Sequence, residues 1–481
     1  MNRVGRVLHR MRHAGARNTI QAFASRARKK ISATEWGRVV FPPVPTVTLE
    51  DARRATKSGV GPMQITRGLF PCEKTDLEAL TETVKREFPE NVAKTIEKAD
   101  AICRHEFDFL GRQVSFGETI DWHWCPESGG SWPNVPSHEY ISGAQNYYRE
   151  DRPGDVKYPW ELNRHQYFVT LAKAFLYTGE DRYAREVCAQ MRDWVESNPY
   201  GQGVNWVSTM EAGLRLISWT NAFNLLQHSE VFQCEGRDLC VVSIYQHALH
   251  INGHLTTDWL VRNNHILGET AALAIFGTAF PAFRDAARIR NRALRLFAHE
   301  LERQVFADGV NAEQSTGYHR FVLEFATLVA GMLDERNAMG RMGPMTEYEV
   351  EVGTPDGSGL GVGDCDDGEV GLPNPEWETF TVCEVRLPSP VHPSTPSGRT
   401  GEGRLAAISE VHKPTTVARG HLCREGGQAV LRAREGQTFV FVRCGEFGLG
   451  GEGACGHSHA DILAPVIYWR GQPLAVDSGT Y

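Results

Sequence analysis

Residues 262–269 read Arg-Asn-Asn-His-Ile-Leu-Gly-Glu, and a helix-like pattern of apolar residues begins inside this stretch. A second polar stretch, Glu-Gln-Ser-Thr-Gly-Tyr-His at 313–319, precedes another run with apolar residues three and four positions apart. Each stretch predicts a loop that brings polar side chains to the N-terminus of a helix. Capping of backbone N–H groups by Asn263 or Thr316 explains one polar group per helix. It does not explain Asn-Asn-His and Tyr-His together, so we expect these groups to line a cleft.

Helical periodicity extends around these stretches, from about residue 75 to about residue 335. Short Gly or Pro stops, such as Thr178-Gly179, separate successive apolar stripes. The pattern predicts stacked helical hairpins. The clearest stripes are Phe168, Leu171, Ala172 and Phe175; Tyr183, Val187, Met191 and Trp194; and Ile289, Ala293, Phe297, Leu301 and Val305.

The last quarter of the chain changes to short β-rich runs and carries Gly-His-Ser-His-Ala-Asp at 456–461. Residues 461–469 and 474–478 read as strands joined by a turn, so a hairpin brings Asp477 back beside the histidines. On an extended strand, His457 and His459 project from the same face. Two imidazoles and a carboxylate suit a divalent metal or proton transfer, and a solvent-facing pair is the alternative.

Together these motifs resemble the heparinase II/III family of polysaccharide lyases, which includes relatives acting on alginate. The motifs are Asn-Asn-His-x-x-Gly-Glu, Glu-Gln-Ser-x-x-Tyr-His, and Gly-His-Ser-His-Ala-Asp followed by Asp-x-Gly-Thr. Residues 157–164 and 203–215 also match the N-terminal domain of the family. Five motifs in this order are specific for the family but leave the substrate open.

The resemblance implies a multidomain α+β fold. A basic segment covers residues 1–45, helical hairpins of an incomplete α/α toroid cover 46–345, and residues 346–481 begin an antiparallel β-sandwich. Because the family's sheet normally continues beyond the position of Tyr481, we expect a sandwich truncated at the C-terminus. Periodicity alone does not predict that the hairpins curl around a cleft.

The resemblance also implies β-elimination on an acidic polysaccharide that contains uronic acid. The reaction needs neutralisation of the C5 carboxylate, a base for the C5 proton and an acid for the leaving oxygen. Asn264 and His265 would donate to the carboxylate, and Tyr318 would serve as base and acid. His457 would be the base for the opposite C5 configuration. The alternative for Tyr318 is a half-buried aromatic with its hydroxyl paired.

Other side chains are expected to contact the substrate. Trp206, Glu211 and Arg215 read as one helical stripe, on which the indole would stack on a sugar and the guanidinium would pair with an acidic group. A packing tryptophan with an internal Arg–Glu pair is equally consistent. The remaining substrate-binding candidates are Asn263, Glu269, Glu313 and His319.

Two other functions stay open. A glycoside hydrolase on the same toroid needs two acids flanking the bond, for which Glu269 and Glu313 are the candidates. A non-catalytic protein that binds or assembles exopolysaccharide would keep the fold without the chemistry. Ultraviolet absorbance of an unsaturated uronate product distinguishes a lyase from both.

The resemblance carries a structural zinc site onto His459 and Asp477 and leaves His457 for substrate. The remaining histidine ligand of the family would lie beyond Tyr481. No organic cofactor is expected. Residues 353–371 are rich in glycine but match a phosphate loop poorly, and residues 364–368 break the spacing of a calcium loop.

Composition restricts the function class. A net charge of −8 disfavours a nucleic-acid binder, and a polyanionic sugar would have to meet locally gathered basic groups. No run of eighteen apolar residues predicts a membrane span. Eleven scattered cysteines without a C-x-x-C pair predict free thiols.

Residues 1–30 are rich in arginine and lack the apolar region of a secretory signal. The family is commonly periplasmic or secreted, which is the expected location, and the cytoplasm is the alternative. The sequence leaves the oligomeric state open.

Overall fold

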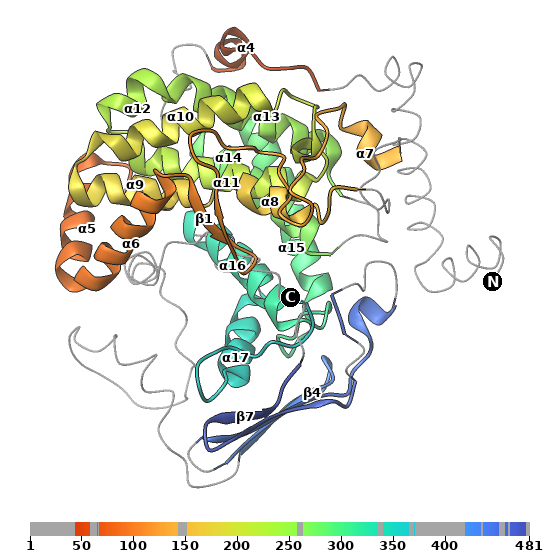
Figure 1. Ribbon diagram of the computed structural model, residues 1–481. Helices are drawn as coiled ribbons and strands as arrows, with labels where there is room; N and C mark the ends of the chain where they lie inside the picture. The colour runs from red at the N-terminus through yellow and green to blue at the C-terminus, as the bar shows by residue number, and fades with distance from the viewer. Residues whose placement is uncertain are drawn as a thin grey trace, which may run out of the picture.

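The computed structural model describes residues 44–57, 65, 67–142, 152–256, 263–333, 340–364, 370, 419–433, 436–451, 457–459 and 462–477. Figure 1 shows layered helices in the upper part and a smaller sheet in the lower part, with α16 and α17 between them.

The helices form an inner and an outer layer. The inner helices, each packed on the next, are α9 (Tyr167–Thr178), α11 (Thr209–Leu226), α14 (Asn264–Ala279) and α16 (Thr316–Leu333). The outer helices, packed on these in the same order, are α10 (Asp181–Ser197), α13 (Arg237–His254), α15 (Ala286–Gln304) and α17 (Met342–Val352). Every residue of α11 is buried, whereas α10 and α15 bury one stripe each, as expected for interior and covering helices.

These helices confirm the predicted hairpins. Gly179 ends α9 in the left-handed region, with φ of 73°, where glycine is tolerated without strain. The stripe from Ile289 to Leu301 is the buried face of α15. None of the helices in the described ranges is long and apolar enough to cross a bilayer.

Shorter elements flank the two layers. They are α4 (Leu49–Arg54), α5 (Lys74–Glu87), α6 (Pro89–Ile102), the hairpin β1 (Glu106–Phe109) and β2 (Arg112–Ser115), α7 (His138–Ser142), α8 (Lys157–Asn163), the 3₁₀ turn η1 (Val204–Trp206) and α12 (Glu230–Glu235). Both α5 and α6 pack on α9, so the helical core extends toward the N-terminus.

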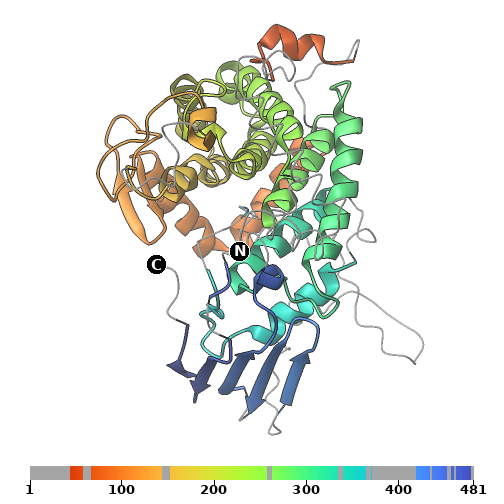
Figure 2. The ribbon, with the colours of Figure 1, turned by 90° about the vertical axis from the view of Figure 1, so that its right-hand side faces the viewer.

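The C-terminal part is one antiparallel sheet in which each strand pairs with the next in the chain (Figure 2). Its strands are β3 (Arg419–Cys423), β4 (Gln428–Ala433), β5 (Thr438–Arg443), β6 (Pro465–Trp469) and β7 (Gln472–Ala475). The predicted final hairpin is confirmed with shorter strands. Arg470 and Gly471 both have positive φ, which fits a two-residue hairpin turn.

One face of this sheet is joined to the helices by a small apolar core. Phe439, Phe441 and Tyr468 pack there with Tyr348 and Val352 of α17. The predicted domain boundary at 345/346 therefore falls inside α17. Helical structure also continues past residue 335, where the predicted periodicity ends. Within the described residues, the strands from 419 to 475 belong to a single sheet. Most of the predicted basic segment, residues 1–43, lies outside the described residues.

Candidate active site

Tyr318 lies in the first turn of α16 and is half-buried. The hydroxyl of Ser315 accepts a hydrogen bond from the backbone N–H of Tyr318 at 3.1 Å, so Ser315 caps this helix. Thr316, the cap considered from sequence, instead donates its hydroxyl to the carbonyl of Leu360 and accepts from the N–H of Val362. The capping loop thus fixes both the helix start and the neighbouring segment 360–364.

The N-terminus of α14 lies near by and has its own cap. The side chain of Asn263 accepts from the backbone N–H of His265 at 3.3 Å, and Asn263 is 4% exposed. Asn263 therefore caps the helix, which is one of the two roles that the sequence allowed for it. His265 itself is partly exposed at the start of the helix.

Asn264 is fully buried against Glu313. Its Nδ2 atom lies 3.1 Å from each carboxylate oxygen, and its backbone N–H donates to one of them at 3.0 Å. Burial raises the pKa of Glu313, although His457, Asn264 and Arg303 oppose the shift. The Oδ1 atom of Asn264 is buried and receives no hydrogen bond from the residues that the structure describes.

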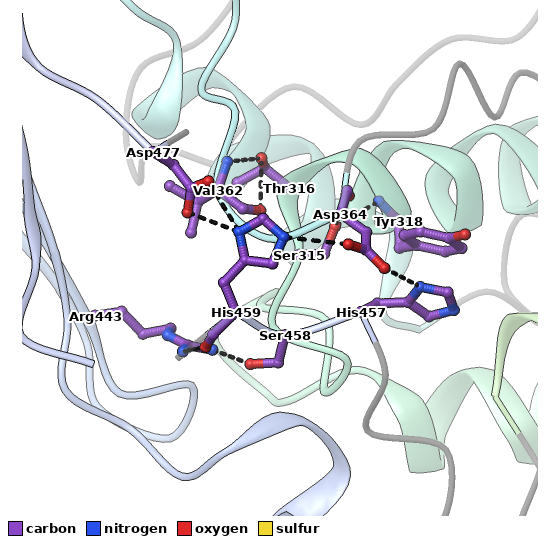
Figure 3. Close-up of polar contacts among 10 residues, drawn as sticks. All are labelled: Ser315, Thr316, Tyr318, Val362, Asp364, Arg443, His457, Ser458, His459 and Asp477. Atoms are coloured by element: carbon purple, nitrogen blue, oxygen red, sulfur yellow. Dashed lines mark hydrogen bonds and ion pairs between the residues drawn. The ribbon is translucent and has the colours of Figure 1, made fainter. Parts of the chain in front are cut away.

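His457 and His459 do not lie on a strand, so that prediction is wrong; β6 begins only at Pro465. The segment is held by the end of β5, where buried Arg443 donates to the Ser458 hydroxyl and to the carbonyl of His459 at 2.6 Å. The rings therefore do not share the face of a sheet, and both turn toward Asp364 (Figure 3).

His457 lies directly against Tyr318. Their rings stack with centroids 3.6 Å apart and planes 22° apart. The Nδ1 atom of His457 is 3.0 Å from Asp364, and Nε2 is 3.7 Å from Glu313. The imidazole of His457 therefore contacts the phenol of Tyr318 and lies near the buried carboxyl group of Glu313. Because the His457 side chain is 19% exposed, solvent reaches this point.

Arg164, at the C-terminal end of α8, was not among the candidates from sequence. It donates to Glu211 at 2.7 Å and also pairs with Glu161. Burial lowers the pKa of Arg164, but Glu161 and Glu211 outweigh it, and Tyr318 adds to the net rise. The guanidinium is therefore within electrostatic reach of Tyr318. The stretch 157–164 carried this residue, but nothing in it signals a neighbour on α16.

Trp206 and Arg215 are 4% and 1% exposed inside the helical core. Trp206 precedes α11, in η1, so the predicted single stripe is wrong. Arg215 donates to Nε2 of His247 at 2.8 Å and to two backbone carbonyls, and it lies over the rings of Trp194 and Trp206. Glu211 hydrogen-bonds to Arg164, and the burial favours packing roles for Trp206 and Arg215.

Glu269 and His319 are also buried. Glu269 accepts from the hydroxyl of Thr209 and from the backbone and hydroxyl of Thr256, which ties three segments together. His319 contacts the carbonyl of Met345 at 3.2 Å, and burial lowers its pKa to about 3. Both groups have the surroundings of scaffold residues.

His459 and Asp477 do come together, with Nδ1 2.9 Å from a carboxylate oxygen. Nε2 of the same ring is 3.1 Å from Asp364, so both ring nitrogens face carboxylates. Structural zinc takes four ligands, and the described ranges contain no group of three or more His, Cys, Asp or Glu side chains that could hold a metal. These residues therefore do not support the predicted zinc site. Most of the calcium-loop stretch, residues 365–368, lies outside the described residues.

Comparisons with known proteins give one consistent result. The model of the heparinase II/III N-terminus matches residues 62–352, and the model of the heparinase II/III-like C-terminal domain matches residues 415–481. A heparin-sulfate lyase of Bacteroides stercoris is 28% identical over 244 residues, which cover 46% of this chain and 32% of the lyase. A heparin-sulfate lyase of Pedobacter heparinus is 30% identical over 170 residues, which cover 34% of this chain and 25% of the lyase.

A crystal structure of heparinase III matches 98% of this chain and 64% of its own, with a TM-score of 0.52 at 16% identity. That match supports the fold alone. The chain thus corresponds to part of each of these relatives.

Proposed function

This chain belongs to the heparinase II/III family, and on that premise we propose that it cleaves a uronic-acid-containing acidic polysaccharide by β-elimination. The observation that carries the proposal is the stack of Tyr318 on His457 beside the Asn264–Glu313 pair. These groups come from separate segments, and each has a part in an elimination. We infer for the fold an incomplete α/α toroid with a β-sandwich, of which the two helical layers and the sheet are the described parts.

Tyr318 is the central proton carrier in this proposal. Its phenol takes the C5 proton and returns a proton to the leaving glycosidic oxygen on the same side of the sugar. The positive charge of Arg164 is within electrostatic reach of this phenol. His457 provides a base beside the phenol for the opposite C5 configuration.

Asn264 serves the substrate carboxylate in this proposal. Its amide now faces Glu313, but the terminal torsion of asparagine is broad and roughly two-fold. A half-turn would point the NH₂ group where Oδ1 now lacks a partner, and Oδ1 would accept from a protonated Glu313. The raised pKa of Glu313 favours that protonated form. The turned amide would then donate to the C5 carboxylate as its charge develops.

The hydrolase alternative has less support. Its two acids, Glu269 and Glu313, are 0% and 1% exposed, and both hold structural hydrogen bonds. A hydrolase needs carboxyl groups that flank the bond, with access to substrate and water. The side chains that remain partly exposed near Asn264 are instead a phenol and imidazoles.

The test is a panel of uronate polymers, including heparan sulfate and alginate, assayed by ultraviolet absorbance of the unsaturated product. The wild-type protein should generate that absorbance on at least one polymer. Tyr318→Phe removes only the hydroxyl and should lower turnover by at least the ~100-fold typical of lost general acid–base catalysis.

Tyr183→Phe is the matched control, because the hydroxyl of Tyr183 bonds Asp100 on the outside of the helical layers. It should keep full activity. New reducing ends without absorbance would indicate hydrolysis, binding without cleavage would indicate the non-catalytic alternative, and an unimpaired Tyr318→Phe enzyme would remove Tyr318 from the mechanism.

A further inference from the structure

Asp364 lies at the point where three segments of the chain converge. Its Oδ2 atom is 3.0 Å from Nδ1 of His457, and its Oδ1 atom is 3.1 Å from Nε2 of His459. Figure 3 shows the carboxylate between the two imidazole rings, with the Tyr318 ring stacked on the face of His457. The carboxylate is 16% exposed, so it is screened from solvent but not sealed.

The main chain around Asp364 is fixed on both sides. The carbonyl of Val362 accepts from the N–H of Thr316 at 2.9 Å, and the carbonyl of Asp364 accepts from the hydroxyl of Ser315 at 2.6 Å. The N–H of Asp364 donates to the carbonyl of His457 at 2.9 Å. Segment 360–364 therefore ties the start of α16, which carries Tyr318, to the segment that carries His457.

Gly363 makes this close approach possible. Its φ is +74°, and a Cβ atom there would lie 2.6 Å from the carbonyl oxygen of His457 and 2.9 Å from Cβ of Ser315. Gly357 has the same φ of +74°, yet a Cβ atom on it would meet no atom of the described residues within 4 Å. The two glycines share the backbone conformation, and only Gly363 is pressed against the site.

The bond to Asp364 decides which nitrogen of His457 carries the proton. A carboxylate only accepts, so Nδ1 of His457 must be the donor. In the neutral imidazole, Nε2 then keeps its lone pair. That lone pair lies on the side of the ring away from Asp364, 3.7 Å from Glu313, and is the basic site that a proton acceptor needs.

We propose that Asp364 is a positioning residue that fixes the tautomer and the ring plane of His457 against Tyr318. The hydrogen bonds of segment 360–364 hold Asp364 itself in place. The inference deepens the proposed function, on which its catalytic meaning rests. In this proposal Asp364 does not touch the substrate. It acts through His457, in the way that a third group orients a catalytic base.

The kinetic test compares Asp364→Asn with Asp356→Asn. The Asp364→Asn change keeps the shape of the side chain but introduces an NH₂ group, which must face a ring N–H of either His457 or His459. A comparable exchange behind a catalytic histidine lowers kcat by several powers of ten. On a polymer with the C5 configuration for which His457 is the base, kcat of Asp364→Asn should fall by at least ~100-fold with KM changed less than about three-fold. Asp356 accepts hydrogen bonds from the backbone N–H and the hydroxyl of Ser358 in its own loop, away from His457, so Asp356→Asn should match the wild type.

A second pair uses the two glycines. Both Gly363→Ala and Gly357→Ala strain a positive-φ position, but only Gly363→Ala should lower kcat, because only it displaces the carbonyl of His457. Equal losses in the two glycine variants, or an unimpaired Asp364→Asn enzyme, would overturn the proposal.

A measurement without turnover separates this inference from the proposed function. Nitrogen-15 NMR of the imidazoles, with His457→Gln to assign the resonance, should show neutral His457 protonated at Nδ1 in the wild type. Asp364→Asn should shift the population toward Nε2–H, and Asp356→Asn should not. A wild-type ring protonated at Nε2 would refute the role of Asp364 even in an active lyase. A protein inactive on every polymer with the expected tautomer would refute the lyase and leave the positioning intact.

Discussion

Two polar clusters with similar composition differ in how far they are closed to solvent. The hub in the helical core, defined as Trp206, Arg215 and His247, is buried, and all three guanidinium nitrogens of Arg215 donate. The seam between helices and sheet, defined as Tyr318, Asp364 and His457, is partly exposed.

The difference shows which of the two imidazoles retains contact with solvent. Burial lowers the pKa of His247 well below its ordinary value, and Nδ1 is committed to the carbonyl of Ser243. That imidazole stays neutral and acts as a fixed acceptor for Arg215. At the seam the nitrogen of His457 that turns away from Asp364 retains access to a ligand. For these two imidazoles, solvent access therefore separates a fixed acceptor from a group that a ligand can approach.

The strongest test of this division is Arg215→Met. It removes three donors and leaves His247 and the carbonyls of Asn163 and Asn205 buried without them. At ~1–3 kcal/mol for each of these three groups, we expect the free energy of unfolding to fall by about 3–9 kcal/mol. Urea unfolding measures this loss. Arg185→Met, which removes an exposed ion pair with Glu235, should cost no more than ~1 kcal/mol.

Arg215→Met should leave the turnover of the remaining folded protein unchanged. If turnover falls while the unfolding midpoint stays constant, Arg215 contacts the substrate, as the sequence first suggested, and the division into hub and seam fails.

Asn264→Ala probes the polar pair next to the seam. Loss of the amide should lower turnover by roughly 100-fold, equivalent to about 2.7 kcal/mol of transition-state stabilisation. Stability should change by only ~1 kcal/mol, because the backbone N–H of Asn264 still donates to Glu313. Turnover on the active polymer and urea unfolding are the two measurements. A large loss of stability with full turnover of the folded fraction would make Asn264 a structural residue.

Much of the fold was predictable because its signals are local. Periodicity gave α14 and α16 with their polar starts, and the hairpin of β6 and β7 follows from Gly471. The local sequence pattern did not decide the role of every candidate residue. It could not decide whether Trp206 faces a sugar or the core, since an indole in a helical stripe is compatible with both.

Long-range contacts were out of reach of the sequence. Asp364 lies 93 residues from His457 in the chain, and its glycine-rich surroundings read as a poor calcium loop. Arg164 is within electrostatic reach of Tyr318, although 154 residues separate them in the chain. Hydrophobic periodicity carries no information on contacts between distant segments, so the site predicted from the sequence lacked Asp364 and Arg164.

The buried histidines outside the seam predict a pH dependence of stability. His319 has its pKa lowered to about 3, chiefly by burial and in part by Arg320, while Met345 opposes the shift. Between pH 6.5 and 3 the unfolded chain binds a proton that the folded chain does not, so stability falls as the pH falls through this window. At pH 5 the part due to His319 is about 2 kcal/mol.

His319→Gln keeps a donor for the carbonyl of Met345 and removes the titration. Urea unfolding at pH 7 and pH 5 should show a smaller loss for this variant, by about that 2 kcal/mol. His165, His247 and His250 are shifted in the same direction and will keep part of the slope. An unchanged slope would mean that His319 is accessible to protons and resembles the seam.

The smallest expected effect comes from Asn263, the neighbour of Asn264. Its side chain caps α14, so Asn263→Ala should cost about 1 kcal/mol of stability. Turnover should change less than about two-fold, since the cap is 4% exposed and its oxygen is committed to the N–H of His265. The two adjacent asparagines would then differ in role: Asn263 would contribute to stability and Asn264 to the rate. Asn263→Gly, which costs a cap only a few tenths of a kcal/mol, is the control for the backbone. If Asn263→Ala instead loses turnover at an unchanged unfolding midpoint, Asn263 contacts the substrate and the active site extends over both asparagines.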